Sequence, residues 1–352
     1  MKVVAGDIGG TKTFLQIVEF NDDGYTVHFE RLFSSAEHSG FADVLRDFID
    51  TVPDKIKLGI EAACIAVAGP ISSDKKSAKV TNLPWRVELS EIKAECHVSK
   101  ARLINDFEAV GHGIAGLKPD DLLCLQEGTP SSHGHCAIIG AGTGLGMGQV
   151  FWNQEQRHIF PSEGGHADFS PNDDQQKELL AYLTKKHKHV SWEHVVSGPG
   201  LVNIYNFLRS TKTTKECKDI RQAMRGNVDK SAVISKFATD VQDPLSTQAL
   251  ELFVRTYASV AGNLALTTLP FGGLYIAGGI APKISSFLTQ KEFISSFRNK
   301  SKMSPLLDQI PVYLVQNSTV GIIGASIVAS QLTEEIKPRN PVRSQNRGYI
   351  PA

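Results

Sequence analysis

The chain lacks several features that define common classes of protein. It has five cysteines among 352 residues, an odd number with no pair at Cys-x-x-Cys spacing, which argues against a disulfide framework and a zinc knuckle. No stretch approaches the roughly 18 apolar residues of a membrane span. Glycine and aspartate follow Met1 too soon for the apolar region of a signal peptide. We therefore expect a soluble cytoplasmic protein with reduced thiols and no membrane partner.

An excess of charge of one sign is also missing. Lys and Arg together number 37, as do Asp and Glu, so the formal net charge is zero. A nucleic-acid binder usually carries a basic excess or stripe. None occurs over the first 330 residues, so we expect no nucleic-acid partner. Residues Ile336–Ala352 differ, with four basic residues, three prolines and no acid. This composition favours a solvated tail, and packing on a partner subunit is the alternative.

The apolar pattern predicts the fold class. Hydrophobic residues make up 41% of the chain, and the length favours about two domains. Apolar strand-like runs alternate with helical patterns, which predicts an α/β architecture. The expected strands are Lys2–Gly6, Phe14–Phe20, Ala62–Val67, Arg102–Ile104, Ala137–Ile139, Gly148–Trp152 and Leu274–Ala277. The expected helices are Phe41–Val52, Phe107–Leu117, Gln248–Leu269 and Gly321–Leu332, with two more that begin at the N-cap serines Ser170 and Ser197.

Two segments of the chain share one plan. Residues 3–20 and 136–152 each consist of an apolar strand, a Gly/Thr turn and a second strand. This similarity predicts a duplicated nucleotide-binding fold in which each half offers one tight turn to a shared ligand. A chance likeness between two glycine-rich hairpins is the alternative.

The first of these turns has the composition of a phosphate site. Gly6–Thr13 resembles a P-loop, but Thr11 stands where that motif requires glycine, and a strand pattern follows instead of a helix. Its glycines let backbone N–H groups approach an anion, and Thr11 and Thr13 add hydroxyl donors. Asp7 could hold Mg²⁺ directly or through water. A plain hairpin with a buried aspartate is the alternative.

The second turn points to the same chemistry. Gly140–Gly146 does not fit G-x-G-x-x-G in any frame, and a strand follows it, which disfavours a dinucleotide site. A turn that wraps further phosphates fits better. Late in the chain, the strand pattern of Leu274–Ala277 ends in the pair Gly278 and Gly279. This pair is either an ordinary turn or a flat backbone patch for an adenine ring.

Three further groups of polar residues are candidates for a ligand site. Asn105 and Asp106 follow a predicted strand, where local sequence favours Asp106 as the N-cap of the next helix over a role in ligand binding. Glu163 and His166 flank two glycines and can point at one small polar ligand, whereas a metal site there lacks a third ligand. Glu193 precedes a helix start, and a solvated surface acid is its simplest interpretation.

Taken in order, these segments resemble the bacterial glucokinase family, within the hexokinase/actin/chaperone-ATPase superfamily. The resemblance runs from Val3 to about Leu332. It is carried by the motifs Gly6–Lys12, Thr81–Trp85, Ile104–Val110, Gly140–Gly146, Glu163–Pro171, Val195–Tyr205 and Ile276–Ile280. The related ROK family of repressors and sugar kinases is less similar, because its clustered-cysteine zinc motif and its helix-turn-helix segment are both missing.

The resemblance implies an α/β, two-lobed actin-like ATPase (ribonuclease H-like) sugar kinase fold with an interlobe cleft. The expected domains are a small lobe of residues 1–112 plus 315–335, a large lobe of 113–314 and a tail of 336–352. It also implies a homodimer.

The resemblance further implies a set of site residues. The expected ATP-binding residues are Gly6, Asp7, Ile8, Gly9, Gly10, Thr11, Gly140, Gly142, Thr143, Gly278 and Gly279, with Asp7 as the Mg²⁺ residue. The expected glucose-binding residues are Asn105, Asp106, Glu163, His166 and Glu193, with Asp106 also the catalytic base. Lys12 is asparagine in some members, which leaves its role open.

The expected function is ATP-dependent phosphorylation of D-glucose to glucose 6-phosphate, the first step of glycolysis. ATP and Mg²⁺ are the expected cofactors. One alternative is an ATP-dependent kinase for another hexose or an amino sugar. The other is a non-catalytic ATP-dependent switch of the actin or chaperone type, which leaves the candidate sugar-binding residues unexplained.

Overall fold

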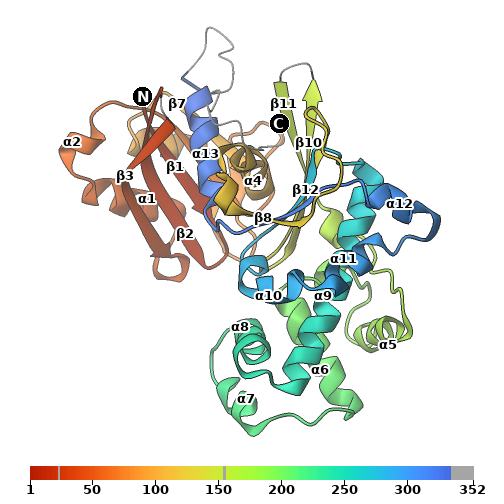
Figure 1. Ribbon diagram of the computed structural model, residues 1–352. Coiled ribbons are helices and arrows are strands. Elements are labelled where there is room, and N and C mark those ends of the chain that lie inside the picture. Colours follow the sequence, from red (N-terminus) through yellow and green to blue (C-terminus); the bar gives the residue numbers. More distant parts are fainter. Residues whose placement is uncertain (23, 154–155, 334–352) are drawn as a thin grey trace. The chain divides into compact units, whose positions relative to one another are not determined.

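The computed structural model describes residues 1–22, 24–153 and 156–333 and divides into two α/β units. Each unit has its own sheet and its own apolar core (Figure 1). The first unit comprises Met1–Pro119 together with 319–333, and the second comprises Asp120–Ser318. The α/β class is therefore as the sequence predicts, while the domain boundaries at 112 and 314 stay a prediction. The expected tail at 336–352 lies outside the described residues.

The first unit has a five-stranded sheet in the order β3-β2-β1-β4-β7. Its strands are β1 (Lys2–Ile8), β2 (Lys12–Asn21), β3 (Gly24–Ser34), β4 (Ile60–Val67) and β7 (Lys100–Asn105). The first three strands are antiparallel, whereas β1, β4 and β7 are parallel. Ile8 pairs with Val67, and Val67 with Asn105. The turns after β1, β4 and β7 therefore leave the sheet at one edge.

Apolar layers cover both faces of this sheet. Val4 and Ile8 of β1 belong to a core with α1 (Phe41–Thr51), whereas Val3 and Ala5 belong to a core with α13 (Val320–Gln331). Burial on both faces explains the apolar run from Val3 to Ala5 in β1. The remaining short elements are α2 (Asp54–Lys57), α3 (Leu89–Glu95), α4 (Asp106–Gly113), β5 (Ser77–Lys79), β6 (Arg86–Glu88), η1 (Ser35–Glu37), η2 (Ile114–Gly116) and, in the second unit, η3 (Pro119–Asp121).

Helices α4 and α13 pack side by side through glycines (Figure 1). A Cβ atom at Gly324 would overlap the carbonyl oxygen of Ala109, and one at Gly113 would overlap that of Val320. The two backbones therefore touch directly. This contact explains the small-residue composition of the predicted helix Gly321–Leu332, which the structure confirms with a shift of one residue at each end.

The second unit has a six-stranded sheet in the order β11-β10-β9-β12-β13-β8. Its strands are β8 (Leu122–Gln126), β9 (Cys136–Ala141), β10 (Leu145–Asn153), β11 (Gln156–Ser162), β12 (Gly273–Ala277) and β13 (Val312–Val315). In both sheets, two antiparallel hairpin strands lie on one side of the central strand: β2 and β3 beside β1, and β10 and β11 beside β9. Parallel strands lie on its other side. The similarity between residues 3–20 and 136–152 therefore extends to five strands of each sheet. This confirms a repeated strand arrangement, while the ligand shared by the two turns stays a prediction.

Helices of the second unit pack around α9 (Pro244–Thr268), of which most residues are buried. The Tyr257 hydroxyl accepts a hydrogen bond from the Ala141 amide at 3.2 Å and donates to the Ile139 carbonyl at 3.3 Å, which ties α9 to the end of β9. The other helices are α5 (Asp174–Leu183), α6 (Gly198–Thr211), α7 (Lys218–Ala223), α8 (Lys230–Lys236), α10 (Ser285–Leu288), α11 (Lys291–Arg298) and α12 (Ser304–Leu307). Short η4 (Gly164–His166), η5 (Trp192–His194), η6 (Phe237–Val241), η7 (Ala281–Ile284) and η8 (Ser301–Met303) join them.

One predicted helix start is wrong. The helix expected after Ser170 begins instead at Asp174, because the Asp173 side chain accepts the Gln176 amide at 2.7 Å and caps it. The preceding chain is still extended, since the Phe169 amide bonds to the Val190 carbonyl at 2.9 Å. The cap at Ser197 is confirmed, with its side chain accepting from Gly200. Among the described helices, none is long and apolar enough to cross a membrane.

The glycine contact predicts a specific loss of stability. We expect Gly324→Ala to lower the free energy of unfolding by about 1–3 kcal/mol, because the added methyl group forces α4 and α13 apart. Urea unfolding followed by circular dichroism measures it. Gln331→Ala, an exposed change on the same helix, is the control and should leave the midpoint unchanged. Equal midpoints for both variants would contradict a direct backbone contact.

Candidate functional site

The turn between β1 and β2 is a compact loop of three residues, Gly9 to Thr11. The Gly9 amide bonds to the Lys12 carbonyl at 2.9 Å, and the Ser35 amide bonds to the Thr11 carbonyl at 3.0 Å. Thr13 does not supply the free hydroxyl that the sequence predicts, because it is fully buried and its Oγ1 pairs with Ser35 Oγ at 3.1 Å. Thr11 remains exposed. The turn therefore presents backbone amides and one hydroxyl to a ligand.

The Asp7 carboxylate lies beside this turn, at the start of α13. A Cβ atom at Gly321 would be 2.9 Å from Asp7 Oδ2, and no residue in the described ranges donates a hydrogen bond to that carboxylate. Burial raises the pKa of Asp7 to about 6. A carboxylate with so few donors is stabilised by a cation, and Mg²⁺ on a nucleotide usually takes only one or two protein carboxylates. Asp7 therefore fits the predicted Mg²⁺.

Among the described residues, Asp7 belongs to no larger cluster of metal-ligating side chains. Within residues 1–22, 24–153 and 156–333, no group of three or more His, Cys, Asp or Glu side chains is placed to hold a metal ion. A cation at Asp7 would therefore take its remaining ligands from phosphate oxygens and water.

The end of β7 corrects one prediction from the sequence. Asn105, and not Asp106, is the N-cap of α4, because its Oδ1 accepts the Phe107 amide at 2.9 Å and the Glu108 amide at 3.4 Å. The strand extends through Asn105, so the cap falls on the first residue outside the helix. Asp106 is the first residue of α4 and accepts the Phe107 amide at 3.1 Å. Its carboxylate therefore stands at the same sheet edge as the turn after β1.

The Asn105 amide group is the part of that side chain left for a ligand. Its Nδ2 reaches only the Gly69 carbonyl, at a long 3.5 Å. Because both hydrogen bonds of the cap use Oδ1, the residue can serve a ligand only as a donor.

In the second unit, three segments meet at the end of β9. The Gly198 amide at the start of α6 bonds to the Gly142 carbonyl at 2.8 Å, and the Ile280 amide bonds to the Ala141 carbonyl at 3.2 Å. Gly278 has a φ of +85° and packs so closely on Ala141 that a Cβ atom would overlap that residue. The structure thus brings the predicted Gly140, Gly142 and Thr143 together with Gly278 and Gly279.

The predicted acids and histidine of the second unit also come together. Glu193 Oε2 accepts the Leu145 amide at 2.9 Å, and Glu193 Oε1 lies 4.0 Å from His166 Nδ1. His166 Nε2 lies 3.8 Å from Glu163 Oε2. The glycine pair between Glu163 and His166 has a packing reason as well, since a Cβ atom at Gly165 would overlap the Leu145 carbonyl. Leu145 therefore links the Gly/Thr turn to the three polar side chains.

Some residues of these sites were missed by reasoning from the sequence. Gly144 lies against the Glu193 carboxylate, and Gly10 lies against Asn82, which has a positive φ of 66°. The motif that contains Asn82 was identified only through the family resemblance. Gly144 could have been singled out as the last glycine before β10, but nothing in the sequence links it to Glu193.

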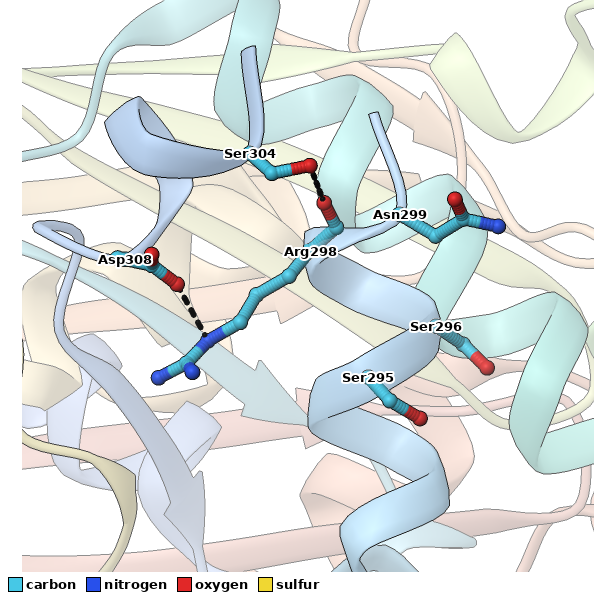
Figure 2. A pocket seen from close by; sticks show the side chains of 6 residues that line it. All are labelled: Ser295, Ser296, Arg298, Asn299, Ser304 and Asp308. Carbon is cyan, nitrogen blue, oxygen red and sulfur yellow. Dashed lines mark hydrogen bonds and ion pairs between the residues drawn. The ribbon is translucent and has the colours of Figure 1, made fainter. Parts of the chain in front are cut away.

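A separate hollow on the second unit is unlike these sites. It has a volume of about 480 Å³ and is lined by residues of α11 and α12 together with Asn299 and Asp308 (Figure 2). Its one arginine, Arg298, is neutralised by Asp308 at 2.9 Å, as the dashed line in Figure 2 marks. None of the predicted site residues lines it.

Known proteins share this duplicated architecture. The crystal structure of a glucokinase from an Antarctic psychrotroph superposes with a TM-score of 0.77 at 30% identity, over 94% of this chain and 99% of that chain. A ROK family glucokinase from Streptomyces griseus, solved with glucose and AMPPNP, has a TM-score of 0.64 at 18% identity, over 94% and 100% of the two chains. These sugar kinases have the two-lobed actin-like ATPase fold, and this chain has it too.

Sequence comparison then identifies the family. The glucokinase family model matches residues 4–332. The glucokinase of Nostoc punctiforme is 44% identical over 343 residues, which cover 94% of this chain and 99% of that protein. The chain belongs to the glucokinase family and is therefore a kinase, which confirms the resemblance drawn from the motifs.

The contact between Gly144 and Glu193 predicts a selective defect. In Gly144→Ala the new methyl group pushes the Glu193 carboxylate off the Leu145 amide. Loss of a hydrogen bond to a charged group should raise KM for glucose by about tenfold, with a much smaller change in KM for ATP. Steady-state kinetics measures both constants. Gly142→Ala is the matched control, because no atom lies within 4 Å of its added Cβ; an equal rise in both variants would refute the contact.

Proposed function

We propose that the protein transfers the γ-phosphoryl group of ATP to the 6-hydroxyl of D-glucose, with Asp106 as the catalytic base. The observation that carries this assignment is the cap of α4. Since Asn105 supplies the cap, the start of α4 does not depend on the Asp106 side chain as its N-cap. The parallel register of β1, β4 and β7 supports a position for Asp106 at the same sheet edge as the amides of the first turn.

The proton transfer follows from this placement. Asp106 accepts the proton of the sugar 6-hydroxyl while the bond from that oxygen to phosphorus forms and the bond to the leaving ADP oxygen breaks. Phosphoryl transfer depends chiefly on positioning and on charge stabilisation, since its transition state is loose. A positioned base contributes roughly 10²–10⁴-fold.

The sugar is assigned to hydrogen-bond donors and acceptors of each unit. In the first unit Asn105 donates through Nδ2. In the second unit Glu163 and Glu193 accept hydroxyl protons, and His166 lies between the two carboxylates. Sites built to hydrogen-bond a hydroxyl reject analogues that lack it by up to about 10⁴–10⁵-fold. This chemistry supports a small polyol as substrate, and the family supports glucose.

The nucleotide is assigned to the glycine turns. Backbone amides of Gly6–Thr11 and of Gly140, Gly142 and Thr143 bind phosphate oxygens. Gly278 and Gly279 form the adenosine patch, where the open surface at Gly279, with no atom within 4 Å of a Cβ there, leaves room for a flat ring. Asp7 holds the Mg²⁺, directly or through water, and the ion when bound neutralises phosphate charge.

The cellular context belongs to the same proposal. We extend it to a cytoplasmic enzyme of the first step of glycolysis that acts as a homodimer, as the family resemblance implies. All five cysteines are free thiols, as expected in a reducing compartment. Burial raises the pKa of Cys136 to about 11, so this thiol is unreactive.

The direct test is ADP release from MgATP with glucose, mannose, fructose, N-acetylglucosamine or no sugar. Release that depends on glucose supports the proposal. Release that depends on another sugar assigns the same chemistry to a different hexose or amino sugar. Release that ignores every sugar would overturn the kinase proposal in favour of an ATP-dependent switch.

The base is tested by Asp106→Asn. We expect kcat to fall by roughly 10²–10⁴-fold because the amide cannot accept the proton. The unfolding midpoint should stay within error of wild type, since Asn105 still caps α4. Rapid-quench measurement of glucose 6-phosphate gives the rate, and calorimetry checks that MgATP still binds. A near-normal kcat would exclude Asp106 as the base.

The two functions of Asn105 can be separated by a pair of variants. Asn105→Asp keeps an N-cap acceptor, because Asp and Asn cap helices equally well, but it removes the Nδ2 donor. We expect KM for glucose to rise about tenfold with the stability unchanged. Asn105→Ala should show the same rise and also lose about 1 kcal/mol of stability. An unchanged KM in both variants would remove Asn105 from the sugar site.

A further inference from the structure

His194 takes part in an unusual cap beside the candidate sugar site. It is the last residue of η5, the short helix that also carries Glu193. The Ser191 side chain accepts the His194 amide, and in return the Ser191 amide donates to His194 Nδ1 at 3.1 Å. Ser191 Oγ also lies 2.9 Å from Nδ1. A capping box ordinarily uses Glu or Gln as this second acceptor, and here an imidazole ring takes that place.

The cap requires the neutral form of the ring. A backbone amide can only donate, so Nδ1 must carry a lone pair and the ring proton must lie on Nε2. An imidazolium has no acceptor, and its Nδ1–H would oppose the Ser191 amide hydrogen. Protonation of His194 is therefore incompatible with the capping box.

The surroundings of His194 favour the neutral form. Burial lowers the pKa of His194, and the neighbouring imidazole of His187, tilted against it at 4.3 Å between ring centroids, lowers it further. His189 and His166 act in the same direction, while Glu193 opposes them. His189 is itself paired with Asp168 at 2.5 Å.

The cap holds Glu193 in place. Next to the cap, the Trp192 amide bonds to the Ala167 carbonyl at 3.0 Å, and the Ser197 hydroxyl donates to the Glu193 carbonyl at 2.7 Å. These bonds fix the backbone from which Glu193 reaches the Leu145 amide at 2.9 Å. If the capping box between Ser191 and His194 opens, η5 loses its N-terminal cap, and the backbone that carries the Glu193 side chain is held less rigidly.

We propose that His194 is a positioning residue for the sugar site, whose neutral imidazole holds Glu193 in its binding position and whose protonation loosens it. This proposal rests on the proposed function, in which Glu193 binds glucose. The direction of the pH effect follows from the chemistry. The cap is complete at pH values above the ordinary pKa of histidine, and it is lost as the pH falls through the pKa of His194 in the folded protein. The ligand affected is glucose, and not the nucleotide.

A pair of substitutions separates the effect of the hydrogen-bond acceptor at position 194 from the effect of protonation of His194. His194→Gln keeps a side-chain acceptor, as in an ordinary capping box, but does not titrate. His194→Leu removes the acceptor. At pH 8 we expect His194→Gln to have a KM for glucose close to that of wild type. His194→Leu should show a rise on the order of fivefold, the factor that one helix cap is worth. KM for ATP and kcat should change little.

The decisive readout is the ratio of KM for glucose in wild type to that in His194→Gln between pH 8 and pH 5.5. The ratio cancels every effect of pH that the two proteins share. We expect it to start near one and to rise on the order of fivefold as the pH falls. His28→Gln is the control, because it removes an exposed histidine of the first unit that neither caps η5 nor shifts the pKa of His194, and its ratio should stay constant.

Two results would overturn the role of His194. One is a constant ratio for His194→Gln across the pH range, and the other is a normal KM for His194→Leu at pH 8. Thermal unfolding of each variant shows whether it is folded, and His194→Gln alone suffices if the leucine variant is not. Wild type without glucose-dependent ADP release at pH 8 would instead contradict the proposed function.

Discussion

The parallel pairing of β1 with β4 and of β9 with β12 is the constraint on which both candidate sites depend. Parallel strands bring their carboxyl ends to one edge, so the turns that follow them must lie together. In the first unit this edge gathers the turn at Gly9, the loop at Gly69 and the start of α4. In the second unit it gathers the turn at Gly142 and the pair at Gly278. Gly69 and Gly278 are glycines because a neighbouring backbone lies too close for a side chain, whereas the space around Gly142 is open.

The sequence was informative where the local pattern and the tertiary structure agree. The central strands are apolar on both faces, so their composition alone located them. The edge strands β3 and β11 were missed, because solvent covers much of β3 and because β11 contains polar residues and Pro161, a composition that edge strands tolerate. The duplication was visible in the two hairpins, but its extension to parallel strands depends on contacts between distant segments.

Within the candidate sites, the sequence identified the polar residues correctly but often assigned them the wrong structural role. Asp106 and Ser170 both looked like N-caps, yet the neighbouring Asn105 and Asp173 cap the helices. Neighbouring polar residues compete for the same amides, and the extent of the preceding strand decides between them. Thr13 looked like a ligand donor, but its hydroxyl is bonded to Ser35, a contact between β2 and η1 that no local pattern reveals.

Two of the proposed sugar residues divide their polar atoms between the fold and the ligand. Asn105 uses Oδ1 for the cap of α4 and keeps Nδ2, and Glu193 uses Oε2 for the Leu145 amide and keeps Oε1. The atom that serves the fold fixes the rotamer before any ligand arrives, so less conformational entropy is lost on binding. A side chain whose two polar atoms made no hydrogen bond within its unit would not be held in one rotamer before the ligand binds.

The two glycine turns differ in one respect that matters for an anionic ligand. Asp7 is the penultimate residue of β1, whereas the penultimate residue of β9 is Gly140. The duplicated frame therefore carries a carboxylate at only one of its two turns. A carboxylate near phosphate is repulsive unless a cation lies between them, so a second acid would add repulsion that one Mg²⁺ could not offset. Under the proposed function, one acid and one Mg²⁺ leave the second turn to bind phosphate through backbone amides alone.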